Sequence, residues 1–445
     1  MNTPTTHTPA TPRLKLIQRT ALTLLVAAGV INYIDRATLA VANSLIREEL
    51  GLSIAQMGYL LSAFLFSYAL SQLPVGAMVD KGGPRLLLTL GLSLWSIAQV
   101  LGGLVNGFWS FLGARVVLGI GEAPMFPTCA RVVRDWFSAR NRGMATGIFN
   151  CSSALGTAIA VPLLTYLMLT FGWRSMFVIM GIAGLVLAFL WGVVYRDPAK
   201  AALTPEEHQH LVEDDPPGRL DQLTWREWKL LFRFRTTWGM ILGFVGTIYI
   251  LWVYSAWLPG YLEMERHISV KQTGYAAAIP FACAVIGGLT GGWFVDWLHR
   301  RGVTLMNSRK IPAGCALLGA ALFTLLAAWV SSNVLAVVFI SLAMFLIQFA
   351  TTCAWALASV ATPANCTASL AAIQNFGGYL GGALAPTVTG LIVQRTGSFA
   401  LALTVAAVIG TVSAIAYFVV VRAPITSAEM DAPNGLRNNL EIETR

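Results

Sequence analysis

The chain has 445 residues, of which 56% are hydrophobic and only 11% are charged. Soluble domains carry roughly 25% charged residues, so this composition excludes a soluble enzyme and predicts a protein that folds in a membrane. The net charge of +9 does not indicate a nucleic acid partner, because the basic residues are spread over the segments that connect apolar stretches.

Twelve apolar stretches are each long enough to cross a hydrocarbon core of about 30 Å, which requires about 20 helical residues. The first six stretches are 20–45, 57–79, 86–105, 108–133, 143–170 and 173–194. The other six are 238–261, 272–297, 311–330, 334–359, 368–393 and 399–421. The sequence therefore predicts an all-α integral membrane protein with twelve transmembrane helices.

One long hydrophilic segment divides these spans into two groups of six. We expect an N-terminal six-helix bundle over 1–195, a cytoplasmic linker over 196–236, a C-terminal six-helix bundle over 237–424 and a cytoplasmic tail over 425–445. Thr204 and Glu207 have the spacing of a capping box, which predicts a short surface helix within the linker.

The basic residues are distributed unequally between the two sides of the predicted membrane. Of the 30 Lys and Arg residues, 23 lie in the two termini, the linker and the connections on the same side, and five lie in the opposite connections. This is the positive-inside pattern, which predicts that both termini and the linker are cytoplasmic in a bacterial-type inner membrane. The basic N-terminal segment leads into an apolar stretch that charged residues interrupt, so we expect no cleavable secretory signal.

Metal and nucleotide chemistry have no support in the sequence. The six cysteines lack the spacing of a metal site, and we interpret them as small packing residues. The sequence also lacks a Walker motif, an HExxH motif and a GxSxG motif. We therefore expect neither ATP-driven transport nor membrane hydrolysis, and no bound metal or cofactor.

The second and eighth predicted spans end in the same pattern, in which a glycine stands four residues before an aspartate and basic residues follow. The pattern occurs at Gly76, Asp80 and Arg85, and 216 residues later at Gly292, Asp296 and Arg300. A glycine at this position permits close helix approach, and the aspartate can cap or pair at the cytoplasmic surface. We expect these residues to take part in the conformational change.

This duplicated motif in a chain of six plus six spans resembles the major facilitator superfamily over essentially the whole length. Three stretches resemble its anion:cation symporter branch, namely 32–36, 121–127 and 136–143, and 296–310 looks most like the bacterial galactonate and glucarate permeases. The resemblance implies two pseudo-symmetric six-helix bundles that work by alternating access. It further implies proton-coupled uptake of an organic anion, with the proton as coupling ion, by a chain that we expect to function as a monomer.

Four ionisable residues fall inside the predicted spans: Asp35, Arg36, Arg115 and Glu122. A charge at the bilayer centre costs about 2.5–3.5 kcal/mol on insertion scales, so such groups face a cavity or pair with one another. Arg115 and Glu122 are seven residues apart and line one wall at different depths, whereas Asp35 and Arg36 point in different directions and need partners on other helices. A buried carboxyl that loses its guanidinium partner can gain a proton, as proton coupling requires. The alternative is a permanent buried ion pair that holds the helices together.

An anionic substrate suits these residues, because a guanidinium offers paired donors to a carboxylate and keeps its charge near neutral pH. The resemblance implies that Arg36 contacts the substrate carboxylate, that Asp35 and Glu122 carry the proton, and that Arg115 exchanges between Glu122 and other acceptors. It also places substrate contacts near four further residues, which are Tyr33, Tyr68, Trp355 and Asn375.

The substrate and the direction of transport stay open at this point. The resemblance implies a sugar acid, but the apolar neighbours of Trp355, which are Ala354 and Ala356, fit a less hydroxylated or aromatic carboxylate equally well. The alternatives to proton-coupled uptake are an exporter or anion exchanger of the same fold and a transporter-like sensor.

Overall fold

The computed structural model describes residues 10–212, 225–363, 366–426 and 429–430, and in this part of the chain every regular element is a helix. The helices form two compact units. The first comprises 1–218, 254–279 and 386–399, and the second comprises 219–253, 280–385 and 400–445. The predicted all-helical membrane fold is confirmed, and the boundaries of the two bundles at 195 and 237 remain predictions.

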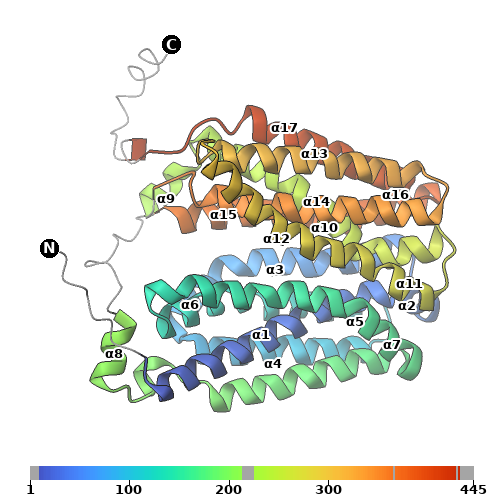
Figure 1. Cartoon of the computed structure of the whole chain (residues 1–445). Helices are drawn as coiled ribbons and strands as arrows, with labels where there is room; N and C mark the ends of the chain where they lie inside the picture. The colour runs from blue at the N-terminus through green and yellow to red at the C-terminus, as the bar shows by residue number, and fades with distance from the viewer. Residues whose placement is uncertain (1–9, 213–224, 364–365, 427–428, 431–445) are drawn as a thin grey trace, which may run out of the picture. The chain divides into compact units, whose positions relative to one another are not determined.

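The first unit contains the helices of the first six predicted spans (Figure 1). They are α1 (Pro12–Val41), α2 (Asn43–Leu50), α3 (Ile54–Gly82), α4 (Pro84–Leu104), α5 (Phe108–Glu122), α6 (Met125–Trp136) and α7 (Ala139–Val194), followed by a 3-10 helix (Pro198–Lys200) and α8 (Pro205–Val212). Both α1 and α4 pack against α7, and α5 packs against α3 and α4. These contacts bring α1, α3, α4 and α5 around a common interior.

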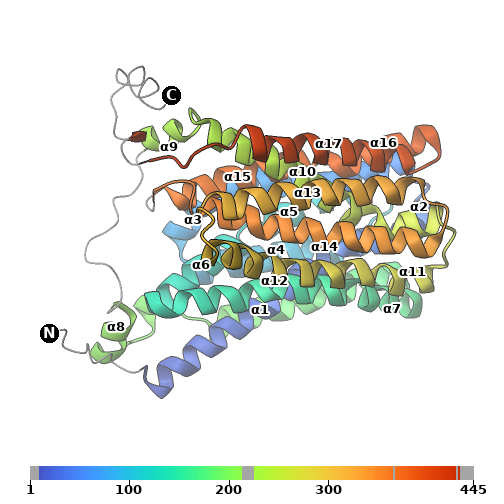
Figure 2. The ribbon, with the colours of Figure 1, turned by 45° about the horizontal axis from the view of Figure 1, so that its top comes forward.

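The later spans are divided between the units. The second unit holds α9 (Trp225–Leu231), α12 (Ala278–Arg300), α13 (Asn307–Trp329), α14 (Asn333–Ala358), α15 (Thr367–Gly382) and α17 (Ala400–Val419). Figure 2 shows α13 beside α14 and α17, against both of which it packs. The first unit takes α11 (Val270–Ala276) and parts of α10 (Arg235–Met264) and α16 (Leu384–Thr396).

Eleven helical stretches of the described chain are long and apolar enough to cross a membrane. The stretch Met144–Val194 contains two of the twelve predicted spans. The two spans are separate helices, because the backbone of α7 leaves the helical conformation at Gly172, with φ 81° and ψ 158°. Only glycine adopts such a conformation without steric cost. The turn between the fifth and sixth spans therefore consists of a single residue.

In the first unit, α16 is hydrogen-bonded to α3, and α10 is hydrogen-bonded to α16. The Thr387 hydroxyl donates to Ser62 Oγ in α3 at 2.8 Å, and the Ala55 N–H at the start of α3 donates to Gln394 Oε1 at 2.8 Å. The Trp257 indole of α10 donates to the Pro386 carbonyl at 3.0 Å. We call Ser62, Thr387, Ala55 and Gln394 the α3–α16 contact.

The predicted capping box at the start of α8 is confirmed. The Thr204 N–H donates to the Glu207 carboxylate at 3.1 Å, and the Glu207 N–H donates to Thr204 Oγ1 at 3.2 Å. The same carboxylate accepts a 2.6 Å hydrogen bond from the Thr11 hydroxyl, and Arg13 donates to the Ala201 carbonyl at 2.8 Å. The start of α1 and the linker helix are thus joined. The cytoplasmic location of the N-terminus and the linker remains a prediction.

Candidate functional site

The four ionisable residues predicted inside the spans are all buried in the first unit. Asp35 and Arg36 in α1 are 0% and 6% exposed, and Arg115 and Glu122 in α5 are 2% and 0% exposed. Among the charged side chains that the structure describes, the other buried one is Glu207 in the linker helix. We call the first four the charge cluster.

An ion pair between α1 and α5 lies at the centre of the charge cluster. Arg36 Nε donates to Glu122 Oε2 at 2.8 Å, across 86 residues of sequence. The prediction that Arg36 or Asp35 must find a partner on another helix is therefore confirmed for Arg36. Arg115, which the resemblance assigned to Glu122, acts electrostatically on both Glu122 and Asp35 but forms no hydrogen bond through Nε or Nη1.

Three aromatic rings surround the Arg36 guanidinium. Its central carbon lies 5.0 Å from the ring centre of Tyr33, 5.4 Å from that of Phe64 and 4.7 Å from that of Tyr68. The Phe64 ring also lies 5.0 Å from the Arg115 guanidinium, so it separates the two cations. Tyr33 and Tyr68 were predicted near the substrate. Phe64 was missed, and its spacing of four residues before Tyr68 was the available signal.

The second carboxyl of the charge cluster has a different environment. Both carboxylate oxygens of Asp35 lack a hydrogen bond within the described chain, as does the indole nitrogen of Trp95, a neighbour of Asp35 in α4. Gln99 of α4 donates to Thr38 Oγ1 at 3.0 Å, and the Thr38 hydroxyl donates to the main-chain carbonyl of Asp35 at 2.7 Å. Asp35 is thus a buried acid with unused hydrogen-bonding capacity, and sequence reasoning missed its α4 neighbours.

Glycines on α5 explain how the neighbouring helices come close enough to enclose the charges. A Cβ at Gly119 would lie 2.5 Å from the Phe64 carbonyl oxygen of α3. A Cβ at Gly121 would lie 2.6 Å from the main-chain nitrogen of Trp95 in α4. Backbone on both sides leaves no room for a side chain. Two residues after Glu122, Pro124 lacks an N–H, which interrupts the helical hydrogen bonds between α5 and α6.

Two predicted substrate residues lie in the second unit. Trp355 in α14 is 43% exposed, and its ring packs edge-on against Phe244 with centres 6.0 Å apart. Asn375 in α15 is half-buried. Its neighbour Gln374 is fully buried, donates weakly to the Ala354 carbonyl at 3.4 Å and leaves its amide oxygen without a hydrogen bond.

The duplicated motif is only partly described. The surroundings of Gly76 and the side chain of Asp80 lie outside the described part. Arg85 donates through Nε to the Gly192 carbonyl near the end of α7 at 2.9 Å. In the second copy Asp296 and Arg300 are exposed, and Arg300 Nε donates to the Asp296 main-chain oxygen at 3.3 Å.

Gly292 does not have the predicted steric role. A Cβ there would make an ordinary 3.7 Å contact with Thr352, whereas one at Gly287 would lie 2.0 Å from the Phe345 carbonyl oxygen. The close approach of α12 to α14 therefore occurs at another glycine.

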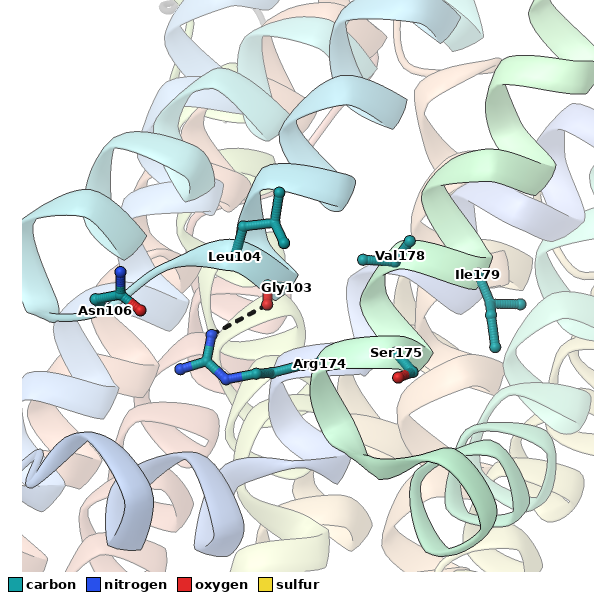
Figure 3. Close-up of a pocket in the computed structure, with 7 residues that line it drawn as sticks. All are labelled: Gly103, Leu104, Asn106, Arg174, Ser175, Val178 and Ile179. Atoms are coloured by element: carbon teal, nitrogen blue, oxygen red, sulfur yellow. Dashed lines mark hydrogen bonds between the residues drawn. The ribbon is translucent and has the colours of Figure 1, made fainter.

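A separate cavity of about 440 Å³ opens where α4 ends and the second half of α7 begins, lined by Gly103, Leu104, Asn106, Arg174, Ser175, Val178 and Ile179 (Figure 3). Arg174 donates to the carbonyls of Gly103 and Val105 at 3.1 and 2.8 Å and pairs with Glu49 at 2.8 Å. This arginine binds the C-terminal carbonyls of α4. Its Nε and Nη1 groups are already used by the Glu49 carboxylate and these two carbonyls.

The comparisons with known proteins agree with this architecture. A sequence model described as the Major Facilitator Superfamily matches residues 25–386. A probable L-galactonate transporter of Escherichia coli strain K12 is 44% identical over 94% of this chain and 92% of its own length. A D-galactonate transporter of Escherichia coli O6:H1 is 34% identical over 90% of this chain and 94% of its own.

The solved structures show the same fold. A bacterial homologue of the human lysosomal transporter Spinster, in an inward-facing and unoccupied conformation, superimposes with a TM-score of 0.78 at 20% identity and covers 93% of this chain and 98% of its own. The chain is accordingly a multi-pass membrane transporter rather than an enzyme, and it belongs to the Major Facilitator Superfamily.

Proposed function

We propose that this chain takes up a galactonate-like sugar acid together with protons, by alternating access. The observation that carries the proposal is the ion pair between Arg36 and Glu122 inside an aromatic enclosure. A substrate carboxylate is the chemical equivalent of the Glu122 carboxylate, so it can replace Glu122 at the guanidinium. The names of the two galactonate transporters support a six-carbon sugar acid as that substrate.

The exchange of Glu122 for the substrate carboxylate at Arg36 would couple transport to protons. When the substrate binds Arg36, Glu122 is left as a fully buried carboxylate that has lost its ion-pair partner. A buried charge without a partner costs several kcal/mol, and protonation removes that cost. Substrate binding and proton uptake therefore favour each other. Asp35 supplies a second buried acid, and Arg115 acts electrostatically on both acids.

The observed pair also fits a permanent structural role, and the two interpretations predict different behaviour of one variant. Glutamine in place of Glu122 keeps the size and hydrogen-bonding capacity of a protonated glutamate but cannot release a proton. In proteoliposomes, Glu122→Gln should retain exchange of labelled for unlabelled L-galactonate and lose accumulation driven by a pH gradient. Glu48→Gln, at an exposed carboxylate on α2, is the matched control and should retain both activities.

The assay also distinguishes the alternatives. Undiminished gradient-driven accumulation by Glu122→Gln would favour the permanent ion pair. Parent protein that exchanges L-galactonate but ignores the pH gradient would be an anion exchanger. A panel containing D-galactonate, glucarate and an aromatic acid identifies the substrate class. Preference for the aromatic acid would overturn the sugar-acid proposal.

A further inference from the structure

Asn32 is a fully buried amide on the face of α1 that carries the charge cluster. It stands three residues before Asp35 and four before Arg36, one helical turn away from both. The side chain is 0% exposed, and neither its nitrogen nor its oxygen has a hydrogen bond within the described chain. Burial of an unsatisfied amide costs about 1–3 kcal/mol, so the arrangement calls for an explanation.

The unused capacity of Asn32 matches an unused acceptor on Glu122. Arg36 occupies Glu122 Oε2, and Oε1 has no hydrogen bond within the described chain. Among the described residues, three side chains favour the ionised form of Glu122: the guanidinium groups of Arg36 and Arg115 and the uncharged amide of Asn32. Both partners of a hydrogen bond are thus present and unoccupied while Arg36 holds the carboxylate.

The chemistry of an amide suits a carboxyl that changes its protonation state. An amide nitrogen donates to a carboxylate, and an amide oxygen accepts from a carboxylic acid. A guanidinium only donates, so it satisfies the ionised form alone. After Arg36 leaves, an amide within reach can satisfy Glu122 both before and after the proton arrives.

We infer that Asn32 is the positioning residue to which Glu122 turns when Arg36 is transferred to the substrate. This inference rests on the proposed role of Glu122 as a proton carrier. Asn32 keeps the carboxyl oriented in both protonation states and thereby sets the pH at which Glu122 exchanges its proton. The charged groups within reach of Glu122 are Arg36 and Asp35 on α1 and Arg115 on α5, and the facing α3 and α4 residues Tyr68, Trp95 and Gln99 are uncharged.

The experiment measures Glu122 directly, with L-galactonate at saturating concentration so that Arg36 is transferred to the substrate. Infrared difference spectra of the purified protein, recorded across a pH titration, show the carbonyl stretch of carboxyl groups that gain a proton. The band that disappears in Glu122→Gln belongs to Glu122. In Asn32→Leu, which has a similar volume and no hydrogen-bonding group, that band should move to higher wavenumber. The midpoint of the Glu122 titration should move to higher pH by about one pH unit, because the ionised carboxylate loses a hydrogen bond.

The controls separate this role from a structural one. Asn43 in α2 is also buried, at 1% exposure, and its amide atoms also lack hydrogen bonds, so Asn43→Leu should leave the Glu122 band and midpoint unchanged. Asn32→Ser, whose hydroxyl both donates and accepts, should show a midpoint between those of the parent and Asn32→Leu. It replaces the leucine variant if that variant fails to fold. In proteoliposomes Asn32→Leu should move the pH profile of L-galactonate exchange in the same direction.

Each outcome decides between the two ideas. A Glu122-dependent band with the parent's position and midpoint in both Asn32→Leu and Asn32→Ser would overturn the role of Asn32 and leave the proposed function intact. Absence of any Glu122-dependent band would remove Glu122 as a proton carrier, and the role of Asn32 would fall with it.

Discussion

The guanidinium of Arg36 donates to a carboxylate, and its central carbon lies over the rings of Tyr33 and Tyr68. Both interactions depend on the flat shape of the group, since a guanidinium forms paired hydrogen bonds to a carboxylate and stacks on rings. An ammonium group is a compact, strongly hydrated charge that reproduces neither geometry. Charge alone is therefore insufficient at this position.

Arg36→Ala should abolish binding of L-galactonate, because the variant loses the cation that compensates the carboxylate. Arg36→Lys should bind at least tenfold more weakly than the parent, because a point charge replaces the planar fork. Equilibrium binding of the labelled acid to purified protein measures both effects. Arg395→Lys, at an exposed arginine in α16, is the matched control. Parent-like binding by Arg36→Ala would remove Arg36 from the site.

The charged residues of the site could be predicted from the sequence, but their pairing could not. A charge inside an apolar stretch is recognisable because its burial is costly, and this identified all four members of the charge cluster. The partner of Glu122 is 86 residues away on another helix, and the spacing along α5 pointed instead to Arg115. Trp95 and Gln99 also lie in an apolar stretch, but uncharged polar residues there give no comparable signal.

At the scale of single helices, α5 carries two glycines that differ only in their surroundings. Gly119→Ala should destabilise the protein by about 1–3 kcal/mol, because the new methyl group meets the backbone of α3 at 2.5 Å. Gly113→Ala, on the same helix with open space around it, should be neutral or slightly stabilising. Thermal unfolding in detergent measures the difference. Equal unfolding temperatures for the two variants would show that α3 and α5 can separate at little cost.

The ion pair of α2 with α7 should respond to pH. The hydrogen bonds from Arg174 and Trp173 lower the pKa of Glu49 below its ordinary value. A lowered pKa in the folded state means that the stabilisation is present at neutral pH and is lost as the pH falls through that lowered value. Because Glu49 is 48% exposed on its side chain, the contribution is about 1 kcal/mol or less.

Glu49→Gln should therefore lower the unfolding temperature slightly at neutral pH. The difference from the parent should begin to shrink near the ordinary glutamate pKa of about 4.3 and vanish once the pH lies below the lowered pKa of Glu49. Glu48→Gln again serves as the control for loss of a surface charge. A difference that persists unchanged at low pH would mean that the amide disturbs packing and not an ion pair.

At the scale of the whole molecule, alternating access requires α3 and α16 to separate at the α3–α16 contact during each cycle. Cysteines at Ser62 and Thr387, whose hydroxyl oxygens lie 2.8 Å apart, should form a disulfide under mild oxidation. Exchange of labelled L-galactonate should then fall to background and recover after reduction. Each single cysteine variant should be insensitive to oxidation. Full exchange by completely cross-linked protein would show that this contact stays closed throughout transport.

The number of the spans could be predicted because hydrophobic length is a strong local signal, whereas helix ends are less local, and the predicted stretch 20–45 runs past the end of α1 at Val41. The interruptions within them are weaker signals. Pro124 marks the break between α5 and α6. The breaks at Ala277 and Ala383 are each followed three residues later by a proline, Pro280 and Pro386, which lacks the N–H that would bond the carbonyl four residues before it. The inclusion of 254–279 and 386–399 in the first unit depends on contacts between distant segments, which a single sequence does not show.

The net charge of the charge cluster determines how transport responds to the membrane potential. Two arginines and two carboxylates sum to zero net charge when both acids are ionised. A bound sugar-acid monoanion changes that sum to minus one, one proton restores zero, and a second proton gives plus one. Moving one elementary charge through the membrane potential is worth about 2.3 kcal/mol per 100 mV. With one proton per anion the loaded carrier is insensitive to voltage, whereas with two protons an inside-negative potential pulls it inward, so a current recorded during transport counts the protons.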